Sequence, residues 1–175
     1  GFTLWSFEDA LKIKEHIHRM FLKARLEKNT AIRGAMLTIA VAGAGFTGIE
    51  TIGEIMEWRK ELCREYEIKM NDVKLIVVEA IDKILPILDD GLIKKSLRFL
   101  KRHNVEVITG EPITEVNEAS IKLKSGREIP TRTLIWTCGV KGSDFGANLG
   151  LTVGGRGRIQ VNEFMQSVDY DSVYA

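Results

Sequence analysis

The stretch VAGAGFTGIE, residues 41–50, carries three glycines at the spacing G-x-G-x-x-G. Between a strand and a helix, Gly43 would permit a tight turn, Gly45 would let the backbone approach a pyrophosphate, and Gly48 would allow close helix–strand packing. The free N–H groups of the first helical turn would then face the phosphates along a favourable dipole. The chemistry that this spacing predicts is dinucleotide binding. The alternative is a glycine-rich turn that holds no ligand.

A carboxylate follows the next apolar run. Glu79 comes directly after residues 73–78, where a carboxylate can accept hydrogen bonds from both hydroxyls of an adenosine ribose. Its charge would repel a 2′-phosphate, so the sequence predicts NAD(H) rather than NADP(H). Glu79 stands 36 residues after Gly43, whereas the usual spacing is about 20; the long helix between them explains the excess. The alternative is a solvated acid at a strand end.

The pattern of apolar residues predicts the elements that would position these groups. Strands are expected at 36–42, 73–78, 105–109 and 133–137, and helices at 6–27, 46–65 and 89–103. Three short runs at 113–117, 120–123 and 128–129, parted by turn residues, indicate an antiparallel meander. The predicted fold class is α/β: a Rossmann-like parallel sheet with crossover helices and an antiparallel β-meander.

Two of the predicted helices have an apolar side that we expect to be buried. In the helix 89–103 it consists of Leu92, Ile93, Leu97 and Leu100. In the helix 6–27 it consists of Phe7, Ala10, Leu11, Ile17, Met20, Phe21 and Ala24. The rest of the helix 6–27 is basic, and we expect a packed helix with a solvated basic face rather than a helix lying on a membrane.

Composition excludes several classes of protein. The 175 residues are 45% hydrophobic and 28% charged, as in a soluble globular protein, and the formal net charge of +1 gives no global attraction to nucleic acid. The two cysteines, Cys63 and Cys138, form no C-x-x-C pair, so neither a disulfide framework nor a zinc site is predicted. We expect a cytoplasmic protein.

Beyond these patterns, the segments GAGFTGIE, VKLIVVEA, KILP and LIWTCGV together resemble the type II NADH dehydrogenases, flavoproteins of the two-dinucleotide-binding superfamily. The resemblance extends over nearly the whole chain. In that family an NAD(H)-binding domain is inserted into an FAD-binding domain. The resemblance therefore implies that this chain binds NADH or NAD, and that FAD belongs to a full-length parent.

The resemblance also implies roles for particular residues. The glycine loop would hold the pyrophosphate, Glu79 the adenosine ribose, and Glu50 would lie beside the nicotinamide, although its place in a first helical turn explains this carboxylate equally well. Cys138 stands where the family more often has Ala, and we expect a small buried side chain without a redox role. The implied cofactor-binding residues are Gly43, Ala44, Gly45, Phe46, Thr47, Gly48, Glu50, Glu79, Ala80, Thr137, Cys138 and Gly139.

Both ends of the chain look incomplete beside that family. The sequence begins without Met, and it stops at Ala175, just before the Gly-Asp pair that contacts FAD in the family. We expect residues 1–30 to belong to or link to the FAD domain, 31–140 to form the NAD(H)-binding domain, and 141–175 to be a loosely held part of the FAD domain. Without that neighbour, the helix 6–27 would expose an apolar strip through which a homodimer could form.

The implied activity of the parent is hydride transfer from NADH to FAD and on to a quinone, on the cytoplasmic face of a membrane that it binds peripherally. No metal is expected. Other members of the superfamily remain alternatives: a ferredoxin or rubredoxin reductase, or a sulfide:quinone oxidoreductase, although the last normally needs a reactive cysteine pair. A non-catalytic NAD(H)-binding module is the third alternative.

Overall fold

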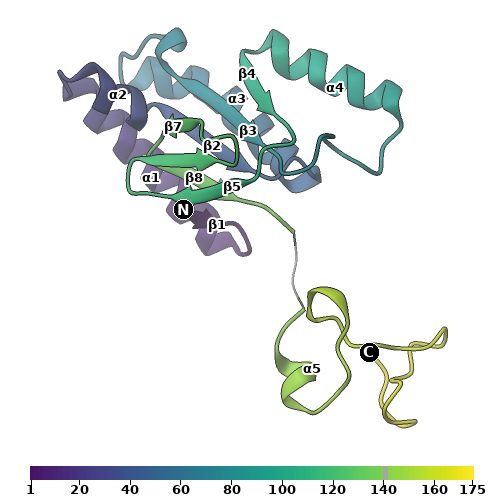
Figure 1. Cartoon of the computed structure of the whole chain (residues 1–175). Coiled ribbons are helices and arrows are strands. Elements are labelled where there is room, and N and C mark those ends of the chain that lie inside the picture. The colour runs from purple at the N-terminus through teal and green to yellow at the C-terminus, as the bar shows by residue number, and fades with distance from the viewer. Residues whose placement is uncertain (140–141) are drawn as a thin grey trace. The chain divides into compact units, whose positions relative to one another are not determined.

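A computed structural model describes residues 1–139 and 142–175, which form two compact units, 1–138 and 139–175 (Figure 1). The first unit is built on a five-stranded parallel sheet in the order β1-β8-β2-β3-β4. Its strands are β1 (Phe2–Thr3), β2 (Thr38–Ala42), β3 (Lys74–Val78), β4 (Val105–Ile108) and β8 (Thr133–Trp136). All five residues of β2 are buried, as a central parallel strand covered on both faces requires.

Four helices and a 3-10 turn connect the strands of this unit: α1 (Phe7–Leu26), α2 (Thr30–Met36), α3 (Phe46–Glu65), α4 (Asp90–Arg102) and η1 (Met70–Asp72). The side chains of Ser6, Asn29 and Asp89 accept hydrogen bonds from backbone N–H groups and so cap α1, α2 and α4. By contrast, α3 begins after Gly45 and has no side-chain cap.

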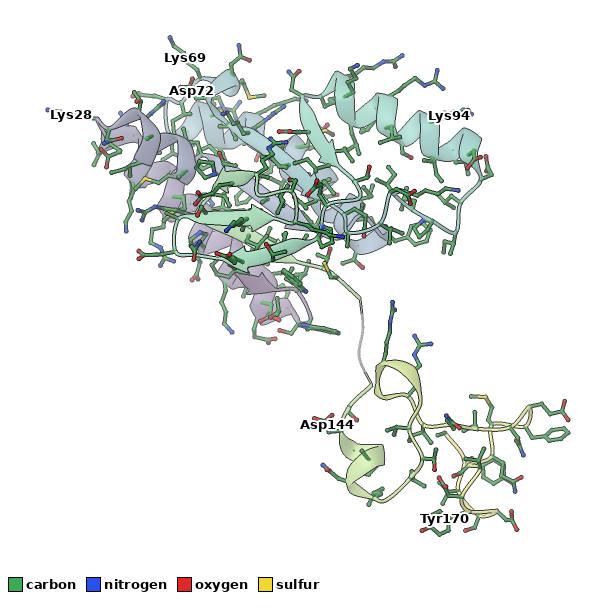
Figure 2. All side chains as sticks on the ribbon, viewed as in Figure 1. Lys28, Lys69, Asp72, Lys94, Asp144 and Tyr170 are labelled. Carbon is green, nitrogen blue, oxygen red and sulfur yellow. The ribbon has the colours of Figure 1, made fainter. Side chains whose placement is uncertain are left out.

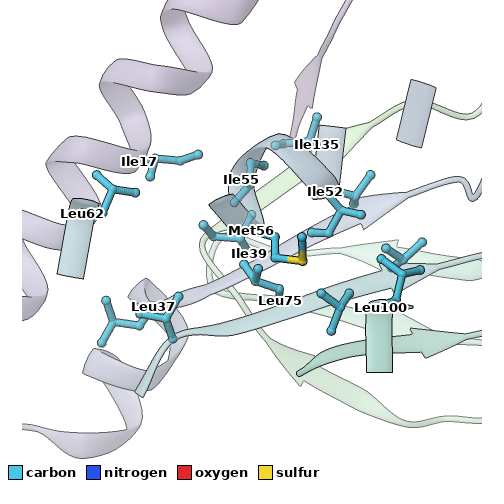
Figure 3. Packing of buried hydrophobic residues seen from close by; sticks show 14 of the residues in the cluster. Ile17, Leu37, Ile39, Ile52, Ile55, Met56, Leu62, Leu75, Leu100 and Ile135 are labelled. Carbon is cyan, nitrogen blue, oxygen red and sulfur yellow. The ribbon is translucent and has the colours of Figure 1, made fainter. Parts of the chain in front are cut away.

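The main hydrophobic core lies between one face of the sheet and the helices α1, α3 and α4. Figure 3 shows Ile17 of α1 and Ile52 and Met56 of α3 beside the strand residues Ile39 and Leu75. These five side chains are at most 2% exposed. The long amphipathic α3 is thereby fixed against β2 and β3, with the glycine loop at its start.

A three-stranded antiparallel sheet, β5 (Ile113–Val116), β6 (Ser120–Leu123) and β7 (Glu128–Pro130), packs against the other face. Ile121, Leu123 and Ile129 of this meander form a second buried cluster with Ala40 and Ile76 of the parallel sheet. Helices, parallel sheet and meander thus form three layers, and the predicted fold class is confirmed.

The predicted buried faces of two helices need correction. In α1, Phe7 (72% exposed), Ala10 and Leu11 face solvent, while Ile13 and His16 are buried instead. In α4, Ile93 and Leu100 are buried, but Leu92 and Leu97 are exposed. The strand β1 and the helix α2 are elements that the sequence pattern did not predict.

Residues 139–175 contain only short elements: the helix α5 (Phe145–Asn148), the turn η2 (Gly155–Gly157) and three isolated β-bridges. Most of their side chains are exposed. The predicted boundary between 140 and 141 lies outside the described residues. Residues 1–30 pack within the first unit, and their membership of an FAD domain stays a prediction.

Two absences concern the described residues alone. No helix among them is long and apolar enough to cross a membrane. Within 1–139 and 142–175, no group of three or more His, Cys, Asp and Glu side chains is arranged to hold a metal ion.

Candidate functional site

The ends of three parallel strands meet at one edge of the sheet. Ala42, the last residue of β2, pairs in register with Val78 of β3 and with Trp136 of β8. The residues that follow these three are therefore neighbours, although they are far apart in the sequence: Gly43, Glu79 and Thr137. The carboxyl edge of a parallel α/β sheet is where ligands of such folds bind.

Gly43 and Gly48 are required by close packing. Gly43 has φ of +98°, which favours glycine, and a Cβ on Gly48 would lie 1.9 Å from the carbonyl oxygen of Gly43. The same Cβ would lie 2.8 Å from the hydroxyl of Thr137. The first turn of α3 is thus pressed against the ends of β2 and β8.

Gly45 has a different environment. A Cβ built on it meets no heavy atom within 4 Å, and the residue itself is exposed. It precedes α3 at the cap position, where no side chain accepts from the first N–H groups of the helix. The result is an open space in front of an uncapped helix N-terminus, where the backbone N–H groups and the helix dipole favour an anion.

Glu79 fastens the glycine loop to the end of β3. One carboxylate oxygen accepts from the N–H of Ala44 at 2.6 Å, and the other accepts from the N–H of Ile81 at 3.2 Å. A carboxylate has about four acceptor positions, so two remain for further donors. Glu79 is partly exposed and can offer them to a ligand.

Ala44 serves the loop itself. Its side chain is fully buried, its N–H is donated to Glu79, and its carbonyl oxygen accepts from the N–H of Leu85 at 2.9 Å. Both polar groups of its backbone are therefore used inside the domain. Ala44 therefore has no free backbone donor for a ligand.

Thr137 ties β8 to the loop. Its backbone N–H and its hydroxyl both lie 2.8 Å from the carbonyl oxygen of Ala42, and the hydroxyl is 3.4 Å from that of Gly43. The side chain thus holds the strand-to-turn transition of β2 from the neighbouring strand.

Cys138 follows Thr137 and is exposed, which corrects the expectation of a buried side chain. Partial desolvation and, to a lesser extent, the negative charge of Glu79 raise the pKa of its thiol. The neutral thiol is the weakly reactive form. The expected lack of a redox role is compatible with this environment and stays a prediction.

The remaining predicted residues surround the opening of the site or lie beyond the first unit. Phe46 and Thr47 are exposed on the first turn of α3, and Ala80 is exposed after Glu79. Glu50 is also exposed, but the first turn of α3 holds no acidic residue, which corrects the expected place of Glu50 in that turn. Gly139, with φ of +80°, begins the second unit. The structure therefore brings together the glycine loop, Glu79, Thr137 and Cys138.

Sequence reasoning missed the contribution of the segment after β3. Ile81 donates to Glu79, and Leu85, which has φ of +45°, donates to Ala44. Both donors are backbone N–H groups, which every residue except proline carries, so the residue types do not reveal these contacts. The only signal available was the KILP segment, whose Pro86 is the second residue of a hydrogen-bonded turn from Leu85 to Leu88.

Comparisons with known proteins identify the family of the chain. Residues 8–175 match the family model of the pyridine nucleotide-disulphide oxidoreductases. The type II NADH:quinone oxidoreductase of Staphylococcus saprophyticus is 33% identical over 99% of this chain and 43% of its own length. That of Staphylococcus haemolyticus is 35% identical over 82% of the chain and 36% of its own length.

Among solved structures, NDH2 from Plasmodium falciparum in complex with NADH superposes with a TM-score of 0.76 at 22% identity, over 82% of this chain and 31% of that one. This likeness supports the fold. The resemblance to type II NADH dehydrogenases is confirmed by the curated relatives, of which the chain spans less than half. Since the family model covers all but seven residues at the start, the chain belongs to the pyridine nucleotide-disulphide oxidoreductase family.

Proposed function

We propose that this chain is the NAD(H)-binding module of a flavin-dependent NADH dehydrogenase. The observation that carries the proposal is the open, uncapped start of α3 at Gly45, set beside the partly exposed carboxylate of Glu79. An anion at the helix start and a hydroxyl-bearing sugar at the carboxylate are two parts of one dinucleotide. The names of the curated relatives point the same way.

In this proposal the pyrophosphate of NADH binds the N–H groups at the start of α3, near Phe46 and Thr47. Glu79 accepts hydrogen bonds from the adenosine ribose while it continues to hold Ala44. The nicotinamide then extends toward Glu50 and toward the end of β8, at Thr137 and Cys138. Thr137 positions the loop and need not touch the ligand.

The carboxylate of Glu79 would also select the cofactor. A 2′-phosphate on the ribose would lie against a negative charge that already accepts from two backbone donors. The module should therefore prefer NADH to NADPH.

For the whole protein, we propose reduction of a quinone by NADH through a bound FAD, at the cytoplasmic face of a membrane. NADH supplies the hydride in that reaction. This chain covers 43% of a relative that carries such a name, and the flavin contacts are expected in the remainder. By itself the chain should bind NADH without turnover, as a non-catalytic module would.

The test is a titration of the purified chain with NADH and with NADPH, with the flavin absorbance recorded in the same sample. We expect saturable NADH binding, weaker NADPH binding and no flavin. Glu79→Arg should lower the NADH affinity by about tenfold or more, the loss of one to two charge-assisted hydrogen bonds, and should reduce the preference over NADPH.

A matched control is Glu118→Arg, the same charge change at an exposed residue between β5 and β6. It should leave both affinities unchanged, and thermal unfolding of each variant shows whether it is folded. An unchanged NADH/NADPH ratio in folded Glu79→Arg would reject the role of Glu79. Tightly bound FAD in the isolated chain would reject the division of cofactors between this chain and the rest of the parent.

A further inference from the structure

A polar cavity lies toward the end of β3 that is opposite Glu79. Its volume is about 510 Å³, and its lining includes Arg59 of α3, Lys74 at the start of β3, Asn71 of η1, and Asn104 and Glu106 around the start of β4. Leu75 and Ile76 of β3 also line the cavity. Because a strand rises about 3.3 Å per residue, the five steps from Lys74 to Glu79 place the charged side chain of Lys74 roughly 16 Å along β3 from Glu79.

The cavity contains a buried cation that lacks a counter-ion. Arg59 is only 6% exposed. Its Nη2 donates to the carbonyl oxygen of His103 at 3.0 Å, but its buried Nε has no hydrogen-bond partner in the described parts of the chain. No ion pair of Arg59 is found among those residues either. Burial of a guanidinium is costly unless an anion or acceptors compensate it, so this arrangement calls for an anionic partner.

The carboxylates near Arg59 are already paired with other cations. Asp72 accepts from Arg33 at 2.9 Å, and Glu106 accepts from Arg127 at 2.8 Å. Lys74, by contrast, is exposed and has no ion pair within residues 1–139 and 142–175. Two uncompensated positive charges, Arg59 and Lys74, therefore line one cavity, together with the amide side chains of Asn71 and Asn104.

We propose that this cavity binds an oxyanion of the phosphate class, separately from the nucleotide loop. Arg59 and Lys74 supply the charge, and the side chains of Asn71 and Asn104 supply further donors. The volume exceeds that of a phosphate group and lies in the range of small-molecule sites. The phosphate can thus be free, or it can be carried by a small organic molecule whose remainder contacts Met70.

The experiment follows the site by NMR while the whole chain is titrated with inorganic phosphate, against sodium chloride at equal ionic strength. We expect the Nε–H signal of Arg59 and the amide signals of Asn71, Lys74 and Asn104 to shift along one saturable curve. A parallel titration with phenyl phosphate identifies the source: tighter binding than phosphate indicates a phosphorylated organic molecule, and equal binding indicates the free ion.

Two variants distinguish phosphate binding in this cavity from nonspecific attraction of phosphate to basic residues. Lys74→Gln changes an exposed residue, so the fold should be retained, and it should weaken phosphate about tenfold. Lys94→Gln is the matched control. Figure 2 shows Lys94 on α4, far from Lys69 and Asp72, which mark the end of the domain where the cavity lies. Lys94→Gln should leave the phosphate affinity unchanged.

Three outcomes would overturn the proposal. Shifts confined to the amides of residues 45–48 would place phosphate at the nucleotide loop instead. Equal shifts with sodium chloride would show screening without a site. Equal weakening by Lys74→Gln and Lys94→Gln would show attraction to the basic surface as a whole.

Discussion

At Gly48 a methyl group would lie 1.9 Å from the carbonyl oxygen of Gly43, whereas at Gly45 it would meet no heavy atom within 4 Å. The two glycines of one motif therefore serve different purposes. Gly48 is fixed by packing inside the domain, and the absence of a side chain at Gly45 keeps open the space in which we place the pyrophosphate.

The pair makes a prediction that separates folding from binding. Gly48→Ala should destabilise the domain by about 1–3 kcal/mol, because the added methyl group would clash with the backbone of Gly43, which cannot rotate away as a side chain can. Gly45→Ala should cost about 1 kcal/mol or less, as a change at a helix cap, yet weaken NADH strongly. Urea unfolding and NADH titration of both variants check this. NADH affinity retained in Gly45→Ala would contradict the placement of the pyrophosphate.

Some features of single residues in the candidate site could be predicted from the sequence, and others could not. The glycine spacing and the acid after the next strand could be recognised, because each depends on residue type and on order along the chain. The hydrogen bond that Glu79 accepts from the N–H of Ala44 could not be predicted, because it depends on the direction of the Glu79 side chain at the end of the strand. The exposure of Cys138 was likewise hidden, since a small residue after a strand suits either environment.

Among the elements, the helices were located well and their buried faces less well. The limits of α3, residues 46–65, were predicted as they are observed, since an apolar period and a glycine loop mark its start. The predicted buried face of α1 wrongly included Phe7 and Leu11, because these residues share the helical period of the core residues. Periodicity cannot tell where along a helix the neighbouring layer ends.

Within α3, Gly53 offers a test of the element itself. It lies in the helix interior, and a Cβ there meets no heavy atom within 4 Å. Gly53→Ala should therefore stabilise the domain by about 0.5–1 kcal/mol, through the lower entropy of the unfolded chain. Gly91→Ala in α4 is the control, because its Cβ would lie 2.9 Å from the capping oxygen of Asp89. Chemical denaturation should show a gain for the first variant alone.

In the first unit as a whole, His16 joins α1 to the outer part of the sheet. Its Nε2 lies 3.0 Å from the carbonyl oxygen of Arg132 and 3.1 Å from the hydroxyl of Thr133, and Arg19 donates to its Nδ1 at 3.2 Å. Burial lowers the pKa of His16; the Arg132 carbonyl opposes this, and nearby positive charges, Arg19 first, reinforce it. The neutral ring therefore belongs to the folded state.

His16 should make the stability of the folded chain fall at low pH. Because the pKa of His16 is lower in the folded chain than its ordinary value of about 6.5, the unfolded chain takes up a proton first as the pH falls. The contribution of His16 is present above about pH 6.5 and is lost progressively below it. Urea midpoints measured from about pH 8 to pH 5 should decline more steeply in the native chain than in His16→Gln. Equal slopes would contradict the assignment.

The hydrogen bonds that assemble the nucleotide loop join residues far apart in the chain. Glu79 lies 35 positions from Ala44, and Thr137 lies 95 positions from Ala42. Closing loops of this length costs chain entropy before any contact compensates it, so we expect such pairs to form late in folding. The glycine motif is thus present from the moment of synthesis, but its ligand-competent shape appears only when β8 docks beside β2. Affinity for a dinucleotide would therefore mark the completion of the sheet rather than the formation of its helices.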